Sequence, residues 1–345
     1  KMTIVMPTID AEGVHGKDPF ENFMLGEIGE KEPWGIEMQA KIFKSYGVQA
    51  TFFLDVYEYS FYGEDRMKKV VETLLKYDQD IQLHTHPGWF EDYRDFEHVT
   101  KMRREQSCFD YKRPWMWGYT FDEQVEILEH GIDCLNRWGA GKPIAHRAGA
   151  YGLNKDTIKA LKAVDILIDS SMFYGHKNCK ETWSKNKVIK RNGILEIPVT
   201  GFYLDEYITF TPLLKWHRLK NIFVKTDIDH CESLDQLCWF LDHATSNNLA
   251  VMNLFMHSYS LLEKTDKFDH FKPSFNQKKK LENFLEYSLN KNNVEVLSFK
   301  QLNERDDLIF DDCVEYIPRF TRHISIFKKL LQKFNQNRFW KSFSF

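Results

Sequence analysis

Short apolar runs rich in β-branched residues recur along the chain and alternate with segments of helical periodicity. Eight runs have the length and composition of strands: 3–9, 50–56, 81–86, 144–147, 166–169, 194–199, 249–256 and 294–299. Six intervening segments carry apolar residues at helical spacing: 34–46, 64–77, 121–138, 154–163, 233–245 and 275–289. Nearly continuous apolar strands that alternate with helices predict a parallel sheet covered by helices.

Seven or eight such units predict the α/β class and a (β/α) barrel over residues 1–305. An open doubly wound sheet is the alternative, but neither GxGxxG nor GxxxxGK[ST] follows the first run, so the phosphate-binding loop of that fold is missing. Longer irregular segments are expected after four strand ends, where a barrel carries its active site: 13–32, 87–118, 171–192 and 201–229.

Residues 306–345 are predicted to form a C-terminal basic amphipathic extension. Residues 317–345 hold seven Lys or Arg and no acid, whereas the whole chain has 47 basic and 50 acidic residues and a formal charge of −3. Apolar residues at spacings of four and three from Phe320 to Phe334 predict an amphipathic helix. This helix would either pack on the barrel or dock on a membrane surface.

The remaining composition narrows the class of protein. The body without the tail is acidic, which argues against a nucleic-acid partner because such a surface needs basic groups to replace counterions. No apolar run reaches the roughly 18–20 residues that cross a bilayer, so we expect a cytoplasmic protein, with peripheral contact at the inner membrane through 317–345 as the alternative. The six cysteines form no CxxC pair, so neither a zinc ribbon nor a disulfide framework is indicated.

Titratable residues stand at the C-terminal ends of five predicted strands. They are Asp10, Glu12, His84, His86, Arg147, Asp169 and His257. Each alone is adequately explained as a cap or an ion-pair partner. Together they lie at the rim where barrels carry out chemistry, so we interpret them as one site.

Two of these strand ends indicate a metal site. Side chains in a strand alternate between faces, so His84 and His86 point the same way, and so do Asp10 and Glu12. Two adjacent carboxylates require a cation or an arginine to offset their repulsion. Two histidines and one carboxylate form a common catalytic zinc site, for which iron, cobalt, nickel or manganese are alternatives.

The groups that remain supply the other parts of a hydrolase of amides or esters. A second carboxylate would act as general base, an arginine would hold it ionised, and a distant histidine would protonate the leaving group. An Fe(II) oxygenase uses the same ligand types but usually a β-sandwich frame, against which the strand–helix alternation argues.

Two further segments, one aromatic and one acidic, have no place in this set of residues. An aromatic cluster that contains Trp89, Trp115 and Trp117 is predicted to be either a platform for sugar rings or a hydrophobic lid. The run from Asp227 to His230 is interpreted as the segment that precedes and caps the helix over 233–245.

In order along residues 8–257, the strand-end motifs resemble the five motifs of the NodB-type polysaccharide deacetylases, carbohydrate esterase family 4. The stretches TIDAEG and LHTHPGW are most similar to the WalW-type branch linked to lipopolysaccharide biosynthesis. The resemblance implies a NodB-like distorted TIM barrel and the metal-dependent removal of an N-acetyl group from a sugar or glycan. The process implied is the synthesis of a bacterial surface polysaccharide, either lipopolysaccharide with its O-antigen or capsule. The alternatives are a hydrolase of a non-sugar amide and a catalytically inactive sugar-binding barrel.

The resemblance also implies roles for individual residues. Asp10 would be the base and Glu12 a metal ligand, displaced by one position from the usual aspartate; the exchanged assignment is the alternative. His84 and His86 would be the other ligands, in a shortened form of the usual second motif. Arg147 would orient the base, and the backbone N–H of Tyr151 would bind the oxyanion. His257 would be the general acid, and Asp169 would either pair with it or line the pocket. Trp89 would contact the substrate. Ser171 stands where the family usually has tryptophan.

Overall fold

The computed structural model describes residues 2–13, 24–87, 115–209, 217–264, 271–308, 310 and 314–325. The chain divides into two compact units, a larger one of residues 1–200 with 225–316 and a smaller one of 201–224 with 317–345. Trp89 and most of the predicted aromatic cluster lie outside the described residues. All the strand ends predicted to carry chemistry belong to the larger unit.

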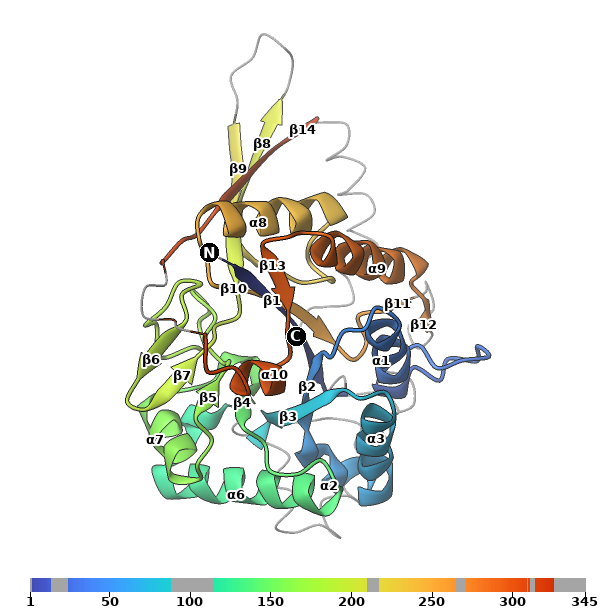
Figure 1. The fold of residues 1–345 in the computed structure, drawn as a ribbon, viewed down its shortest axis with the longest axis vertical. Helices are drawn as coiled ribbons and strands as arrows, with labels where there is room; N and C mark the ends of the chain where they lie inside the picture. The colour runs from blue at the N-terminus through green and yellow to red at the C-terminus, as the bar shows by residue number, and fades with distance from the viewer. Residues whose placement is uncertain are drawn as a thin grey trace. The chain divides into compact units, whose positions relative to one another are not determined.

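A curled sheet forms the frame of the larger unit (Figure 1). Its strands follow in the order β10 (Val251–His257), β1 (Thr3–Ala11), β2 (Thr51–Asp55), β3 (Asp80–Thr85), β4 (Ala145–Ala148), β5 (Ile168–Asp169), β7 (Ile194–Glu196) and β6 (Ile189–Arg191). A further strand, β13 (Val294–Val296), pairs with the first residues of β1, on the edge that β2 occupies further along. Pairing is parallel throughout except between β6 and β7. The eight predicted strands are confirmed, although the last is shorter than predicted because Phe299 begins the helix α10 (Phe299–Asn303).

Single-residue bridges span the gap between β10 and β7. The Thr226 N–H donates to the Thr200 carbonyl at 3.0 Å, and the Phe255 N–H donates to the Thr226 carbonyl at 2.9 Å. Asp227 and Phe255 form a further parallel bridge beside β10. Because one side of the sheet is joined by bridges and not by full strands, the predicted (β/α) barrel is confirmed in a distorted, NodB-like form.

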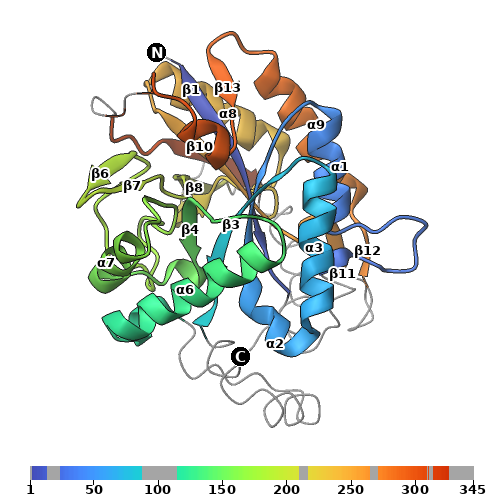
Figure 2. The same cartoon turned by 60° about the horizontal axis from the view of Figure 1, so that its bottom comes forward.

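The helices follow one another around the outside of this sheet (Figure 2). The six predicted helices are confirmed as α1 (Ile36–Ser45), α3 (Glu64–Lys76), α6 (Phe121–Arg137), α7 (Lys155–Ala163), α8 (Leu234–Ser246) and α9 (Phe275–Leu289). Shorter elements are α2 (Tyr59–Tyr62), the 3₁₀ turns η2 (Val56–Glu58), η3 (Met116–Gly118) and η4 (Gly149–Tyr151), and the hairpin of β11 (Leu262–Lys264) with β12 (Phe271–Pro273). Capping boxes at Thr120 and Asn154 begin α6 and α7.

The smaller unit corrects two predictions. It is a three-stranded sheet in the order β14 (Arg319–Ser325), β8 (Gly201–Thr209) and β9 (His217–Lys225), the last residue of which belongs to the larger unit. The prediction of irregular structure over 201–229 is therefore wrong for β8 and β9. The predicted helix is wrong over 319–325, because this segment pairs along its whole length with β8.

The remainder of the tail, 326–345, lies outside the described residues, so its docking stays a prediction. Within the described part of the chain, no helix is long and apolar enough to span a membrane.

A buried glutamine joins β3 to the beginning of β4. The Gln82 Nε2 donates to Asp80 Oδ1 at 2.6 Å. Its Oε1 accepts hydrogen bonds from the N–H groups of Ile144 and Ala145 at 2.8 and 2.9 Å. One side chain thus satisfies two backbone donors at the point where β4 enters the sheet.

We expect Gln82→Met to lower the free energy of unfolding by about 2–4 kcal/mol, because it leaves the two N–H groups without a partner. Urea unfolding followed by circular dichroism measures the change. Lys69→Met, which places the same side chain on the exposed face of α3, is the control and should change stability little. Equal effects of the two substitutions would contradict a structural role for the Gln82 amide.

Candidate active site

Strand register brings the predicted residues to one end of the barrel. In the pairing of β1 with β10, Asp10 lies opposite His257. In the pairing of β3 with β4, His84 lies opposite Arg147. Because parallel strands end at the same edge, residues far apart in the sequence meet there.

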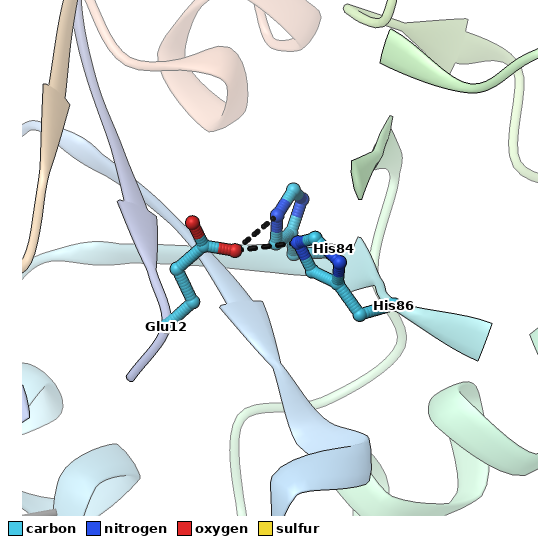
Figure 3. Close-up of side chains that lie close together, drawn as sticks. All are labelled: Glu12, His84 and His86. Carbon is cyan, nitrogen blue, oxygen red and sulfur yellow. Dashed lines mark hydrogen bonds and ion pairs between the residues drawn. The ribbon is translucent and has the colours of Figure 1, made fainter. Parts of the chain in front are cut away.

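Glu12, His84 and His86 direct their donor atoms at one point (Figure 3). The Glu12 Oε2 is 3.2 Å from His84 Nε2 and 2.5 Å from His86 Nε2. The donor atoms of the three residues all lie within 4.8 Å of one another. Carboxylate and imidazole groups in this number are typical of a catalytic zinc site with open coordination positions.

The hydrogen bonding of His84 also fits a metal ligand. Its Nδ1 lies 2.8 Å from the Arg147 carbonyl oxygen, and since a carbonyl only accepts, Nδ1 carries the proton. This arrangement leaves the Nε2 lone pair directed at Glu12, as in metal sites where a second partner fixes the tautomer. The residues present therefore fit a divalent ion.

Charge at the three residues is strongly coupled. Burial opposes ionisation of Glu12, but the imidazoles of His86 and His84 outweigh it and hold the pKa of Glu12 well below its usual range. Burial likewise opposes a charge on His84, yet Asp10 and Glu12 raise the pKa of His84. A metal cation would replace the protons in stabilising the Glu12 carboxylate.

Asp10 lies beside this cluster and is held by Arg147. The Arg147 Nη1 donates to Asp10 Oδ1 at 2.7 Å and to Thr8 Oγ1 at 3.1 Å. The same guanidinium donates twice to Ser170 and is fully buried. Asp10 Oδ2 is 3.9 Å from His84 Nε2, farther than Glu12 is from either imidazole. This difference favours Glu12 as the ligand and Asp10 as the free carboxylate.

His257 lies on the other side of Glu12 and is held by a residue to which the sequence analysis gave no role in the site. The His257 Nε2 is 3.9 Å from Glu12 Oε1, and its Nδ1 is 3.2 Å from Asp229 Oδ2. Ser260 Oγ donates to the same Asp229 oxygen at 2.8 Å. Burial opposes ionisation of Asp229, but His257 lowers the pKa of Asp229 below its usual value. The two aspartates in the run from Asp227 to His230 were a usable signal, but the run was interpreted as a helix cap.

Asp169 has a different partner from the predicted one. Its Oδ1 lies 2.7 Å from His146 Nδ1 and accepts a hydrogen bond from Ser171 Oγ at 2.8 Å. Burial opposes its ionisation, yet His146 lowers the pKa of Asp169, and burial together with Asp169 raises the pKa of Glu196 well above its usual value. Asp169 is fully buried and pairs with His146, so the predicted pairing with the acid histidine is not seen.

Other residues hold the end of β1 in place. The Gly13 N–H donates to the buried Glu58 Oε1 at 2.7 Å, Ser258 Oγ donates to the Glu12 carbonyl, and the Ser258 N–H donates to the Asp10 carbonyl at 3.1 Å. Burial raises the pKa of Glu58 well above its usual value. The roles of Glu58 and Ser258 depend on tertiary packing. Ser258 follows His257 in the sequence, but no pattern in the sequence predicts a role for Glu58.

Tyr151 belongs to the turn that follows β4. Ala150 and Tyr151 have φ angles of 48° and 61°, in the left-handed region that non-glycine residues rarely adopt. Two tryptophans of the predicted aromatic cluster, Trp115 and Trp117, are stacked with ring centres 4.8 Å apart. Ser171 donates to Asp169 and accepts from the Ala148 N–H, so it is a buried connector at the usual tryptophan position.

No protein-family model and no curated protein matches the sequence. Among solved structures, a Mycobacterium smegmatis protein assigned as a polysaccharide deacetylase matches with a TM-score of 0.53 at 16% identity, over 88% of this chain and 90% of that one. A family 4 carbohydrate esterase from Streptomyces lividans, in complex with acetate, gives 0.39 at 10% identity, over 85% and 89%. A family 4 pseudoenzyme from Bacillus anthracis gives 0.43 at 11% identity, over 94% and 70%. The first of these likenesses shows that the chain has the fold of the polysaccharide deacetylases.

Gly149 packs flat against the His86 imidazole. A Cβ atom at this position would lie 2.6–2.7 Å from three atoms of the His86 ring, closer than real contacts allow. We therefore expect Gly149→Ala to displace His86 and to weaken zinc or cobalt binding by about 10–100-fold, the range seen when the support of a ligand is lost.

Isothermal titration with each metal, after chelator treatment, measures the affinity. Ala150→Gly is the matched control, because it adds no atom and its φ of 48° suits glycine, so its metal affinity should equal that of the unmodified protein. Unchanged affinity in Gly149→Ala would show that His86 is not a ligand.

Proposed function

We propose that this protein is a metal-dependent N-deacetylase of carbohydrate esterase family 4 that acts on an N-acetylated sugar. The observation that carries the proposal is the convergence of Glu12, His84 and His86 between two charged pairs, Asp10 with Arg147 and His257 with Asp229. Base, metal ligands and acid are the components that amide hydrolysis requires. The likeness of fold to the M. smegmatis protein supports the same conclusion.

The metal would be held by Glu12, His84 and His86, with zinc as our first choice because of the donor set. When bound, a divalent ion would act as a Lewis acid on the acyl carbonyl and make a water molecule more acidic.

The protein's own residues would then move two protons. Asp10 takes a proton from the water whose oxygen attacks the acyl carbon, and the Arg147 guanidinium holds this carboxylate in place. His257 Nε2 gives a proton to the amide nitrogen as the C–N bond breaks, which releases acetate and a free amine. Asp229 holds the opposite nitrogen, Nδ1, so that Nε2 faces the reacting group. The backbone N–H of Tyr151 remains the proposed oxyanion donor.

We assign Asp169 a positioning role. It holds His146 and Ser171, and His146 Nε2 lies 3.0 Å from the hydroxyl of Thr85, which stands between the two histidine ligands. Removal of this support is expected to disturb β3 and β4 together. On the resemblance of the motifs, we further propose that the substrate is an intermediate of a bacterial surface polysaccharide and that the reaction takes place in the cytoplasm.

Asp10→Asn and His84→Ala separate catalysis from metal binding. Asp10→Asn should keep its metal but lose about 10²–10⁴-fold in kcat, because the proton acceptor is gone. His84→Ala should lose bound metal as well, because one ligand is removed. Acetate release from N-acetylglucosamine oligosaccharides, combined with elemental analysis, measures both properties. Normal deacetylation by both variants after chelation would rule out the proposed function.

Asp229→Asn tests the pairing of the acid. We expect kcat to fall about 100-fold or more with little change in KM and no loss of metal, because the carboxylate that holds His257 Nδ1 is removed. Asp242→Asn is the matched control, since Asp242 is a partly exposed carboxylate on α8 that binds Tyr287. An equal kcat in the two variants would remove Asp229 from the mechanism.

A further inference from the structure

A lysine that the proposed mechanism does not use enters the candidate active site. Lys225 ends β9, directly before the residue that bridges Thr200 and Phe255, and its side chain is only 12% exposed. Its Nζ is 3.8 Å from the centre of the Phe255 ring. The Arg147 guanidinium and the His257 ring contact the same phenyl ring, with centres 5.1 and 5.0 Å away. The ammonium is therefore near the residues proposed to move protons.

The charge of Lys225 is only loosely matched. The nearest carboxylate oxygen among the described residues is Asp227 Oδ2 at 3.6 Å, which is beyond a hydrogen bond. Asp227 is itself engaged by His230, whose Nδ1 and backbone N–H each lie 2.5 Å from one of its oxygens. Burial opposes ionisation of Lys225, but Tyr151 and Asp227 outweigh it and raise the pKa of Lys225, so the ammonium is charged.

The Tyr151 side chain is a polar neighbour of this ammonium, whose Nζ lies 5.6 Å from the centre of the Tyr151 ring. An ammonium group can only donate, whereas the Tyr151 hydroxyl can both donate and accept. Burial raises the pKa of Tyr151, which keeps the phenol protonated. Among the residues that the structure describes, no carboxylate lies within hydrogen-bond distance of the Lys225 ammonium, so its N–H groups and the Tyr151 O–H can donate to a ligand.

The other charged groups of the site already have close partners. Asp10 binds Arg147, Asp229 binds His257 and Asp227 binds His230. A partly buried group of donors with a positive charge favours an acceptor-only, negatively charged ligand. Carboxylate and phosphate share this chemistry.

We propose that Lys225 and the Tyr151 hydroxyl form a subsite for an anionic substituent, a carboxylate or a phosphate, on the N-acetylated sugar. This inference rests on the proposed deacetylase function and specifies its substrate class. The substituent would bind beside the acyl group, with Lys225 supplying the charge and Tyr151 a directional hydrogen bond.

Acetate release from three substrates tests the subsite: an uncharged N-acetylglucosamine oligosaccharide, an N-acetylmuramic acid disaccharide with its carboxylate, and N-acetylglucosamine 6-phosphate. We expect kcat/KM for one anionic substrate to exceed that for the neutral one by roughly 10–100-fold, the contribution of a hydrogen-bonded ion pair. The two anionic substrates distinguish carboxylate from phosphate. Equal kcat/KM for all three would overturn the proposal.

Lys225→Met should abolish this preference, mainly through KM for the anionic substrate, and leave kcat/KM for the neutral substrate within about threefold of the unmodified protein. Lys225→Arg should retain part of the preference. Lys272→Met removes an exposed charge on β12 and should leave kcat/KM unchanged for both the neutral and the anionic substrates. A proportional loss for all substrates in Lys225→Met would show a structural role and overturn the subsite.

Two measurements keep the test decisive if Lys225→Met unfolds or if no substrate is turned over. Tyr151→Phe removes a single hydroxyl and should reduce the anionic preference by about 3–10-fold. Calorimetric binding of N-acetylglucosamine 6-phosphate against N-acetylglucosamine needs no catalysis. Absence of acetate release from every substrate would reject the deacetylase function, whereas tighter binding of the phosphate, lost in Tyr151→Phe, would still support the subsite.

Discussion

In-register parallel pairing is the constraint on which the site depends. The register of β1 with β10 sets Asp10 opposite His257, and that of β3 with β4 sets His84 opposite Arg147. A slip of one residue would turn each of these side chains to the other face of the sheet. All nine residues of β1 are buried, so a slip would also disrupt packing on both faces. The chemistry of the rim therefore depends on the stability of the core.

The barrel end holds several ionised groups out of water, and their pairing makes this tolerable. Glu12 has His86, Asp10 has Arg147, and Asp229 has His257, each within 2.5–3.2 Å. Burying a charge without a partner is strongly unfavourable. Removal of one member of such a pair therefore destabilises the protein, because the other charge stays buried and unpaired. The arrangement places the proposed base, Asp10, and the proposed acid, His257, on either side of Glu12. Lys225 departs from this pattern, since its closest carboxylate is shared with His230.

Site residues could be predicted from the sequence where their positions follow from strand periodicity. They could not be predicted where their positions depend on tertiary contacts. The spacing of His84 and His86 alone predicts convergent imidazoles, and the structure brings both to Glu12. Asp229 reaches His257 from a loop, and no periodic pattern reports such a contact. The predicted tail helix failed for a different reason: Phe320 and Ile324 are four apart, a spacing that suits one face of a helix and one face of a strand equally. Pairing with β8 decided between them.

The segment from Arg147 to Tyr151 contacts several parts of the site. The Arg147 side chain holds Asp10 while its carbonyl orients His84, so one residue supports both the proposed base and a proposed metal ligand. Two residues later Gly149 lies against His86, and after two more the Tyr151 ring lies with its centre 5.6 Å from Lys225 Nζ. Reaching both from a short strand requires a sharp change of direction, which explains the left-handed φ angles of Ala150 and Tyr151. Such backbone costs about 1–3 kcal/mol for each residue and persists only where surrounding contacts hold it, as they do here.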